Sequence, residues 1–189
     1  MLGHLIFLTG GNMEEIRDKR GLTESEAIER YRSRNYPKPA LTSDAVIFWK
    51  DGDEYKVLLV WRGGHPFIHK WALPGGFANE NEPVEITANR ELEEETGVKG
   101  VEMKLVDVFS KPGRDPRGWV VSAAFYTVLM TPPEVNAGDD AADAGWFTIS
   151  RVDGKLRLKK GEVVVTSDDL AFDHEEVIER ALEVAGIVL

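Results

Sequence analysis

The alternation of apolar and polar stretches predicts a β-sheet accompanied by three helices. Two nearly continuous apolar runs, residues 44–49 and 56–61, enclose the turn sequence 51–54 and predict a hairpin with both faces covered. Further strands are predicted over residues 71–76, 103–110, 119–130 and 145–149, with an acidic loop over 131–144 and a small added hairpin over 155–165. The strands predict a mixed sheet.

Three segments have the character of helices. Thr23 and Glu26 have the spacing of a capping box, which predicts a helix that runs to about Asn35. Pro83 and Gly97 bracket a second helix, and apolar residues at helical spacing predict a third over residues 172–184. A mixed sheet with a central and a C-terminal helix on its faces places the chain in the α/β class.

The chain of 189 residues suits one main domain with a lead-in segment. We expect residues 1–40 to form the lead-in, which would pack on the domain or on a partner subunit, and residues 41–189 to form the domain. Within the lead-in, residues 1–12 have two interpretations. They form an ordinary first strand, or they are an extension that precedes a natural start at Met13.

Composition excludes several classes of site and partner. The chain contains no cysteine, which excludes disulfides and thiolate metal sites and fits a cytoplasmic location. The formal net charge of −10 argues against nucleic acid as a partner. No apolar run reaches the 18 or so residues of a membrane helix, so no membrane association is expected.

The charge of residues 75–98 is unusual for a helix. Seven glutamates and one cation, Arg90, lie between Phe77 and Val98. Glu91, Glu94 and Glu95 fall within an arc of roughly 100°, where they repel one another and oppose the helix dipole. This face is either a solvated acidic surface or a site for a hard divalent cation, Mg²⁺ or Mn²⁺.

The spacing of these residues resembles the signature motif of the Nudix hydrolase superfamily, the Nudix box. Gly76, Glu82 and the continuous segment 90–98 fill its defining positions. The resemblance implies an α/β/α sandwich with a mixed sheet. It also implies specific roles, in the order of the chain: the Gly75 carbonyl as a possible metal contact, Gly76 and Gly97 for backbone conformation, Glu82 paired with Arg90, Glu91 and Glu95 as metal ligands, and Glu94 as a ligand or water-holder.

Residues outside the box resemble one subgroup of this superfamily, which includes ADP-ribose pyrophosphatases and the Nudix domains of NAD-linked transcriptional regulators. The matching segments are 65–67, 71–77, 113–118, 120–122 and 170–174. The resemblance implies a homodimer that hydrolyses ADP-ribose to AMP and ribose 5-phosphate with Mg²⁺, which would neutralise the diphosphate and lower the pKa of water.

Two other functions stay open. The first is hydrolysis of oxidised nucleoside triphosphates, since the box is shared. The second is an ADP-ribose-binding regulator without catalysis. A regulator would carry an added DNA-binding domain, whereas about a dozen residues follow Val177 and the chain is acidic.

The catalytic base and the substrate contacts have several candidates. Glu94 is the first choice as general base, followed by Asp139, Asp140 and Asp173. Alternatively, the acidic loop is solvated, and Asp173 with His174 caps the last helix. Arg114 and Arg117 are candidates for phosphate or ribose contacts, or they are surface-turn residues. Phe67 and Trp119 would stack an adenine, or they belong to the core, and His65 and His69 are expected to be polar loop residues.

Overall fold

The computed structural model describes residues 15–136 and 141–189, and it divides the chain into two compact units, Met1–Lys38 and Pro39–Leu189. The first unit contains α1 (Glu24–Arg32). Its capping box is present, because the Thr23 hydroxyl accepts from the Glu26 N–H and the Glu26 carboxylate accepts from the Thr23 N–H. The predicted helix is therefore confirmed, although it ends at Arg32 rather than near Asn35. The strand interpretation of residues 1–12 lies outside the described residues.

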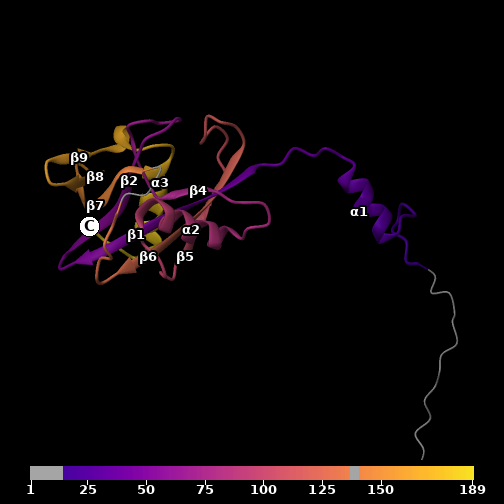
Figure 1. Ribbon diagram of the computed structural model, residues 1–189, viewed down its shortest axis with the longest axis horizontal. Helices are drawn as coiled ribbons and strands as arrows, with labels where there is room; N and C mark the ends of the chain where they lie inside the picture. Colours follow the sequence, from indigo (N-terminus) through magenta and orange to yellow (C-terminus); the bar gives the residue numbers. More distant parts are fainter. Residues whose placement is uncertain (1–14, 137–140) are drawn as a thin grey trace, which may run out of the picture. The chain divides into compact units, whose positions relative to one another are not determined.

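The second unit is built on one mixed sheet (Figure 1). Its strands are β1 (Ala40–Asp51), β2 (Glu54–Arg62), β3 (Trp71–Ala72), β4 (Gly75–Phe77), β5 (Lys104–Phe109), β6 (Val120–Leu129), β7 (Ala141–Val152), β8 (Lys155–Lys160) and β9 (Val163–Val165). The order is β5-β6-β1-β2-β7-β8-β9, with β3 beside β2 and β4 beside β1. β1 and β6 run parallel, and the other adjacent strands in this order run antiparallel.

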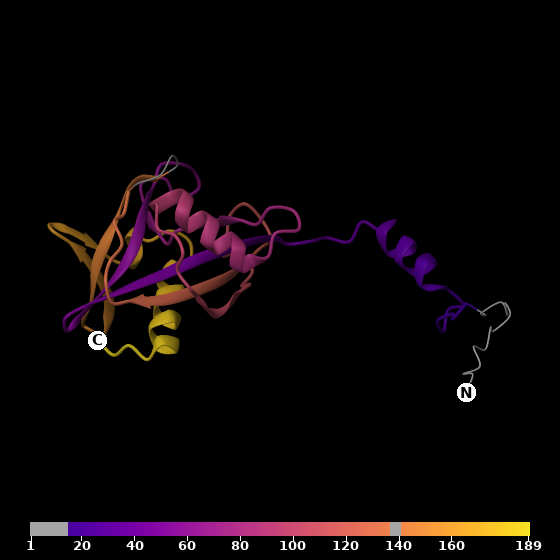
Figure 2. The ribbon, with the colours of Figure 1, turned by 60° about the horizontal axis from the view of Figure 1, so that its bottom comes forward.

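Helices α2 (Val84–Thr96) and α3 (His174–Ala185) cover opposite faces of this sheet (Figure 2). Because side chains alternate along a strand, β1 supplies both interfaces. Ala45 and Ile47 belong to the apolar cluster of Leu92 in α2. Val46 and Phe48 belong to the larger cluster that contains four buried residues of α3, which are Val177, Ile178, Ala181 and Leu182. The arrangement confirms the predicted α/β/α sandwich.

Two strand predictions differ from the structure. The predicted strand 71–76 is two short strands that pair with different neighbours, β3 with β2 and β4 with β1. Pro74 lies between them and has no N–H to donate to a ladder. The predicted acidic loop 131–144 also ends early, because β7 begins at Ala141 and Asp143 pairs with Trp61 of β2. Pairing with a neighbouring strand outweighs the low strand propensity of aspartate there.

The hairpin predicted over residues 155–165 is present as β8 and β9. A short 3₁₀ helix, Ser167–Asp169, leads from this hairpin toward α3. None of the helices in the described part of the chain is long and apolar enough to cross a membrane.

Candidate active site

Helix α2 brings its glutamates against the glycines of β4. Gly97 ends the helix in the left-handed conformation, with φ of 72°, where its N–H donates to the Glu93 carbonyl. Ala88 and Leu92 are buried and dock the helix on the sheet. On a neighbouring face, the Glu91 carboxylate lies where a side chain at Gly76 would stand, since a Cβ there would be 2.4 Å from Glu91 Cδ. A glycine is therefore required at position 76 for this approach.

Glu95 is a strongly perturbed carboxyl group of this site. Its Oε2 accepts a 3.0 Å hydrogen bond from the Gly75 N–H. The pKa of Glu95 is raised to about 8, chiefly by burial and also by the nearby charge of Glu91, and the Gly75 hydrogen bond opposes part of this rise. Without a cation, the folded protein thus favours the protonated form of this side chain near neutral pH.

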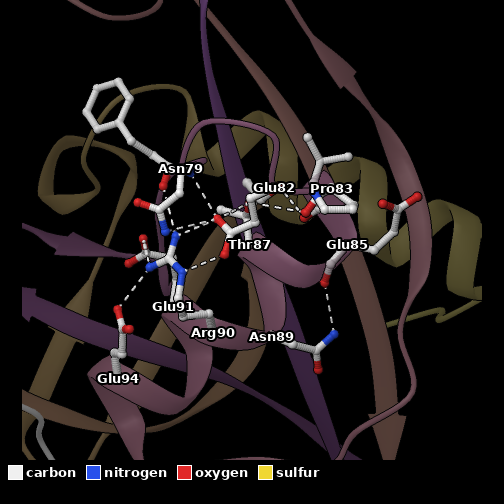
Figure 3. A network of polar contacts seen from close by, with 12 residues as sticks. Asn79, Glu82, Pro83, Glu85, Thr87, Asn89, Arg90, Glu91 and Glu94 are labelled. Atoms are coloured by element: carbon white, nitrogen blue, oxygen red, sulfur yellow. Dashed lines mark hydrogen bonds and ion pairs between the residues drawn. The ribbon is translucent and has the colours of Figure 1, made fainter.

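Arg90 joins the loop before α2 to the acidic face of the helix (Figure 3). Its Nε and Nη2 each donate to Glu82 at 2.9 Å, and Nη2 also donates to the Phe77 carbonyl at 2.9 Å. Its Nη1 donates to Glu91 at 2.7 Å and to Glu94 at 3.0 Å. One guanidinium therefore forms the predicted pair with Glu82 and also holds two mutually repelling glutamates together.

The donor set fits a hard divalent cation. Glu95 supplies carboxylate oxygens beside the backbone of Gly75, Glu91 supplies them beside Gly76, and Glu94 lies one helical turn from Arg90, which binds it; such oxygens are the ligands that Mg²⁺ and Mn²⁺ prefer. Within residues 15–136 and 141–189, no three acidic or histidine side chains already converge as a metal-binding group. Arg90 Nη1 is instead the counter-charge of Glu91 and Glu94, and the Gly75 N–H is the partner of Glu95.

A small pocket of about 60 Å³ lies beside the two glycines that meet these glutamates. It lies against β1 and β4 and beneath two loops, and its polar lining includes Asp44, Arg62, Arg114, Asp115, Arg117 and His174. The remaining lining residues are Thr42, Leu73, Gly75, Gly76, Phe77 and Phe172. The glycines that line the pocket place it directly beside the carboxylates.

The three arginines of this pocket are held in different ways. Arg114 is only 4% exposed and donates to both oxygens of Asp173, at 2.8 and 2.7 Å. Arg117 donates to the buried Asp115 through Nε and Nη2, and its guanidinium lies 4.6 Å from the Phe77 ring centre. Arg62 donates through Nε to the Pro66 carbonyl, and burial together with the charge of Arg117 lowers its pKa.

The capping interpretation of Asp173 and His174 is wrong. Asp173 occupies the N-cap position of α3, but its side chain makes no capping hydrogen bond and instead binds Arg114. The guanidinium of Arg114 binds both carboxylate oxygens in a bidentate pair, which takes the place of the cap. His174 is buried, and its Nδ1 accepts a 2.9 Å hydrogen bond from the Leu73 N–H. Burial lowers the pKa of His174, which keeps the ring neutral.

The remaining predicted residues lie in different surroundings. Phe67 packs on Phe172, with ring centres 4.7 Å apart, and lines a neighbouring hollow rather than the main pocket. Trp119 is 57% exposed and is not among the residues that line the main pocket. Asp139 and Asp140 lie outside the described residues. His69 stacks on Trp61, and His65 is exposed, as a polar loop residue would be.

Sequence reasoning missed several residues of the pocket. Asp44 begins an apolar run and is nevertheless buried, where its Oδ2 accepts from the Ser122 hydroxyl at 2.5 Å. A carboxylate at the head of a buried strand was a usable signal, because buried charges are rare unless paired. The sequence offered no comparable signal for Arg62, Phe77 or Phe172, which reach the pocket from β2, β4 and the segment before α3.

An α/β/α sandwich whose central helix places Glu91, Glu94 and Glu95 near an arginine-lined pocket has the groups suited to metal-assisted hydrolysis of a diphosphate. Residues 40–166 match the sequence profile of the NUDIX domain, and the chain belongs to this family.

Several named proteins are similar in sequence to this chain over most of its length. An "ADP-ribose pyrophosphatase" of Methanocaldococcus jannaschii is 36% identical over 162 residues, which cover 86% of this chain and 83% of the relative. The "ADPR responsive transcriptional repressor NtrR" of Acinetobacter baylyi is 29% identical, over 84% of this chain and 59% of the relative. A crystal structure of a MutT/nudix family protein from Enterococcus faecalis is 37% identical, with a TM-score of 0.78 over 89% of this chain and 71% of that chain.

Proposed function

We propose that this protein is a Mg²⁺-dependent hydrolase that cleaves ADP-ribose to AMP and ribose 5-phosphate. The observation that carries the proposal is the contact between the two halves of the site. The same two glycines line the arginine-rich pocket and meet Glu91 and Glu95 of α2. A diphosphate in this pocket would therefore lie beside the carboxylates. The two relatives whose names refer to ADP-ribose support the choice of substrate.

In this proposal, Glu91 and Glu95 hold the metal, with the Gly75 carbonyl as a further contact and Mn²⁺ as a possible substitute for Mg²⁺. A bound divalent ion would neutralise charge on the diphosphate and lower the pKa of water. Arg90 would continue to orient the helix, because its bonds to Glu82 and to the Phe77 carbonyl do not involve the proposed ligands.

Glu94 is our proposed general base or metal ligand. Its side chain is 58% exposed and is held by one hydrogen bond from Arg90, so it is free to accept a proton from water and release it to solvent. Asp173 is less suited to this role, because both of its oxygens accept from the buried Arg114.

Arg117 is the stronger of the two predicted phosphate contacts. It is 40% exposed in the pocket, whereas Arg114 is almost fully enclosed and bound to Asp173. We therefore assign Arg117 to direct contact with the substrate and Arg114 to the frame of the pocket.

A substrate panel tests the proposed reaction. Purified protein is incubated with ADP-ribose, NADH, diadenosine polyphosphates and nucleoside triphosphates, including oxidised ones, with and without Mg²⁺. We expect metal-dependent release of AMP and ribose 5-phosphate from ADP-ribose at the highest kcat/KM of the panel. Preferred turnover of an oxidised triphosphate would support the alternative substrate, and the absence of metal-dependent turnover would refute a catalytic role.

Variants of adjacent glutamates test the assignment of roles. Glu94→Gln and Glu95→Gln should lower kcat by roughly 10²-fold or more, as expected for loss of a base or a metal ligand. Glu93→Gln is the matched control, because Glu93 lies on the same turn, is 53% exposed and faces Lys99 instead of the pocket. Full activity in Glu95→Gln would reassign the metal site.

The regulator function has a specific observation in its favour, namely the similarity to a repressor that is responsive to ADPR. The chain spans 59% of that relative. ADP-ribose binding without turnover, or binding of duplex DNA in a mobility-shift assay, would favour this function over catalysis.

We further propose that the protein is a homodimer in which residues 1–40 pack as an arm on the partner subunit. Light scattering should give about twice the chain mass of 21.1 kDa. A monomeric mass would reject the dimer and leave the proposed reaction untouched.

A further inference from the structure

The segment that leads into α3 is fastened to the strand that enters the site. Leu170 bridges to Trp71 in parallel register, and the Ala171 N–H donates to the Trp71 carbonyl at 2.8 Å. Phe172 follows with φ of 52°, a left-handed conformation that is strained for a non-glycine residue. Its ring is held between Phe67 and the guanidinium of Arg62. The strained turn therefore presents the next two side chains, Asp173 and His174, in a fixed orientation.

We propose that Asp173 and His174 are positioning residues with separate roles. His174 holds the backbone of residues 73–75, next to the proposed metal ligands, and Asp173 holds the loop of residues 111–118, which lines the proposed substrate pocket. The inference deepens the proposed function, since it assigns to these two residues the geometry of the same site. Neither residue is assigned contact with the reacting atoms.

His174 fixes the backbone that carries Gly75. Leu73 falls in the gap between β3 and β4, where its N–H has no strand partner and donates to His174 Nδ1 at 2.9 Å. An N–H left unbonded in this buried position would destabilise the present backbone arrangement, because it would lose its desolvated partner. The bond also requires that Nδ1 carry no proton, so that the proton of the neutral ring is on Nε2.

The other side of the His174 ring faces Asp44. Nε2 is 3.7 Å from Asp44 Oδ1, and Asp44 is itself held by the Ser122 hydroxyl at 2.5 Å. Asp44 Oδ1 would be 2.6 Å from a Cβ at Gly75, so it lies against the same backbone. The His174 ring therefore binds the Leu73 N–H through one edge and faces Asp44, which lies against Gly75, with the other. Loss of the ring should shift residues 73–75, and with them the Gly75 N–H that donates to Glu95.

Asp173 acts on a different segment, 59 residues away in sequence. It binds Nε and Nη2 of Arg114, and Arg114 belongs to the loop that also carries Asp115 and Arg117. Arg114 lies 3.8 Å from Asp44 and is almost wholly enclosed, so it cannot turn to solvent if Asp173 is lost. The loop would then shift together with Arg117, whereas the Leu73–His174 bond would persist.

The two positioning roles predict different kinetic effects when His174 or Asp173 is replaced. His174→Leu removes the acceptor at similar size and should lower kcat for ADP-ribose by about 10²-fold, the cost of a displacement of roughly 1 Å, with KM within about threefold. Asp173→Leu should raise KM by about tenfold or more, as for a lost charge-assisted contact, with kcat within about threefold. Glu175→Gln, a change on the same first turn of α3, is the control and should leave both constants unchanged.

Conservative variants separate positioning from general stability. His174→Asn places an oxygen near the position of Nδ1 and should restore most of kcat, whereas His174→Gln places its oxygen one bond farther away and should not. If His174→Leu does not fold, the comparison of Asn with Gln carries the test. Asp173→Asn retains one acceptor for Arg114 and should raise KM less than Asp173→Leu.

Two spectroscopic measurements need no substrate. Hydrogen exchange at the Leu73 amide should be slow in the native protein and in His174→Asn, and fast in His174→Leu and His174→Gln. The ¹⁵N spectrum of native His174 should show an unprotonated Nδ1. A protonated Nδ1, unchanged Leu73 exchange in His174→Leu, or equal changes in kcat and KM in both Leu variants would overturn the inference. Failure of the native protein to cleave ADP-ribose would refute the proposed function, and the exchange measurements would still decide the role of His174.

Discussion

Gly75 and Gly76 are adjacent glycines that should respond to alanine in opposite ways. A Cβ at Gly75 would be 2.4 Å from the Ser43 backbone oxygen and 2.9 Å from Asp44 Cα. A Cβ at Gly76 would be 2.4 Å from Glu91 Cδ and 2.5 Å from both carboxylate oxygens. Both contacts fall short of an optimal separation of roughly 3.5 Å by about 1 Å. A methyl group added at position 75 would collide with backbone atoms, whereas one added at position 76 would collide with the end of a side chain.

This difference sets the magnitudes. For Gly75→Ala, β1 and β4 must separate within a close-packed sheet, and overpacking of this kind costs about 1–3 kcal/mol, or a fall in Tm of roughly 3–10 °C. For Gly76→Ala, the Glu91 side chain can rotate away, so Tm should change by less than about 3 °C. The displaced carboxylate is a proposed metal ligand, and a misplacement of about 1 Å can lower kcat/KM by roughly 10²-fold.

The assay combines thermal unfolding in EDTA with ADP-ribose hydrolysis at saturating Mg²⁺. Gly75→Ala should lose stability, and Gly76→Ala should keep its stability and lose activity. Mg²⁺ binding by calorimetry should be weakened in Gly76→Ala even without substrate. A larger loss of stability in Gly76→Ala than in Gly75→Ala would refute the argument from contact atoms, and unchanged Mg²⁺ affinity in Gly76→Ala would remove Glu91 from the ligand set.

Three further predictions concern charges of the site. The hydrogen bonds from Arg90 hold the pKa of Glu82 well below its ordinary 4.5, so Glu82→Gln should lower Tm at pH 7 and have a smaller effect as the pH falls below about 4.5. Glu95 has its pKa raised from 4.5 to about 8 by burial, so the stability of the metal-free protein should fall as pH rises through this range. Glu95→Gln should lack that fall in thermal melts, and Mg²⁺ should restore Tm at pH 8 only in the native protein. Arg117→Met should raise KM for ADP-ribose by about 10- to 100-fold in steady-state assays, the range expected for a lost hydrogen bond from a charged donor, with little change in kcat.

The features that were predictable from sequence are those encoded within a short stretch. The runs at 44–49 and 56–61 contain their own turn, and α2 has its own start and stop signals at Pro83 and Gly97. The pair of Glu82 and Arg90, which the family resemblance implied, spans only eight residues and is present. Local sequence determines such features, and the tertiary structure leaves them nearly unchanged.

The pocket was not predictable in the same way, because its contacts join distant segments. Leu73 and His174 are 101 residues apart, Asp44 and Ser122 are 78 apart, and the parallel pairing of β1 with β6 brings the latter two together. The error at Asp173 has the same origin. An aspartate before a helix has the propensity of a cap, and only the fold reveals that a buried arginine competes for its oxygens.

The charges around the pocket indicate why this acidic protein would need a bound cation before it can hold an anionic substrate. Arg62, Arg114 and Arg117 are matched in number by Asp44, Asp115 and Asp173, so this part of the site is close to neutral. On the α2 side, among the described residues, the single cation Arg90 is bonded to three glutamates, Glu82, Glu91 and Glu94, which leaves that side negative. A diphosphate would therefore meet repulsion there until a divalent ion is bound. Substrate affinity and metal affinity should then be coupled, because each ligand reduces the electrostatic cost of the other.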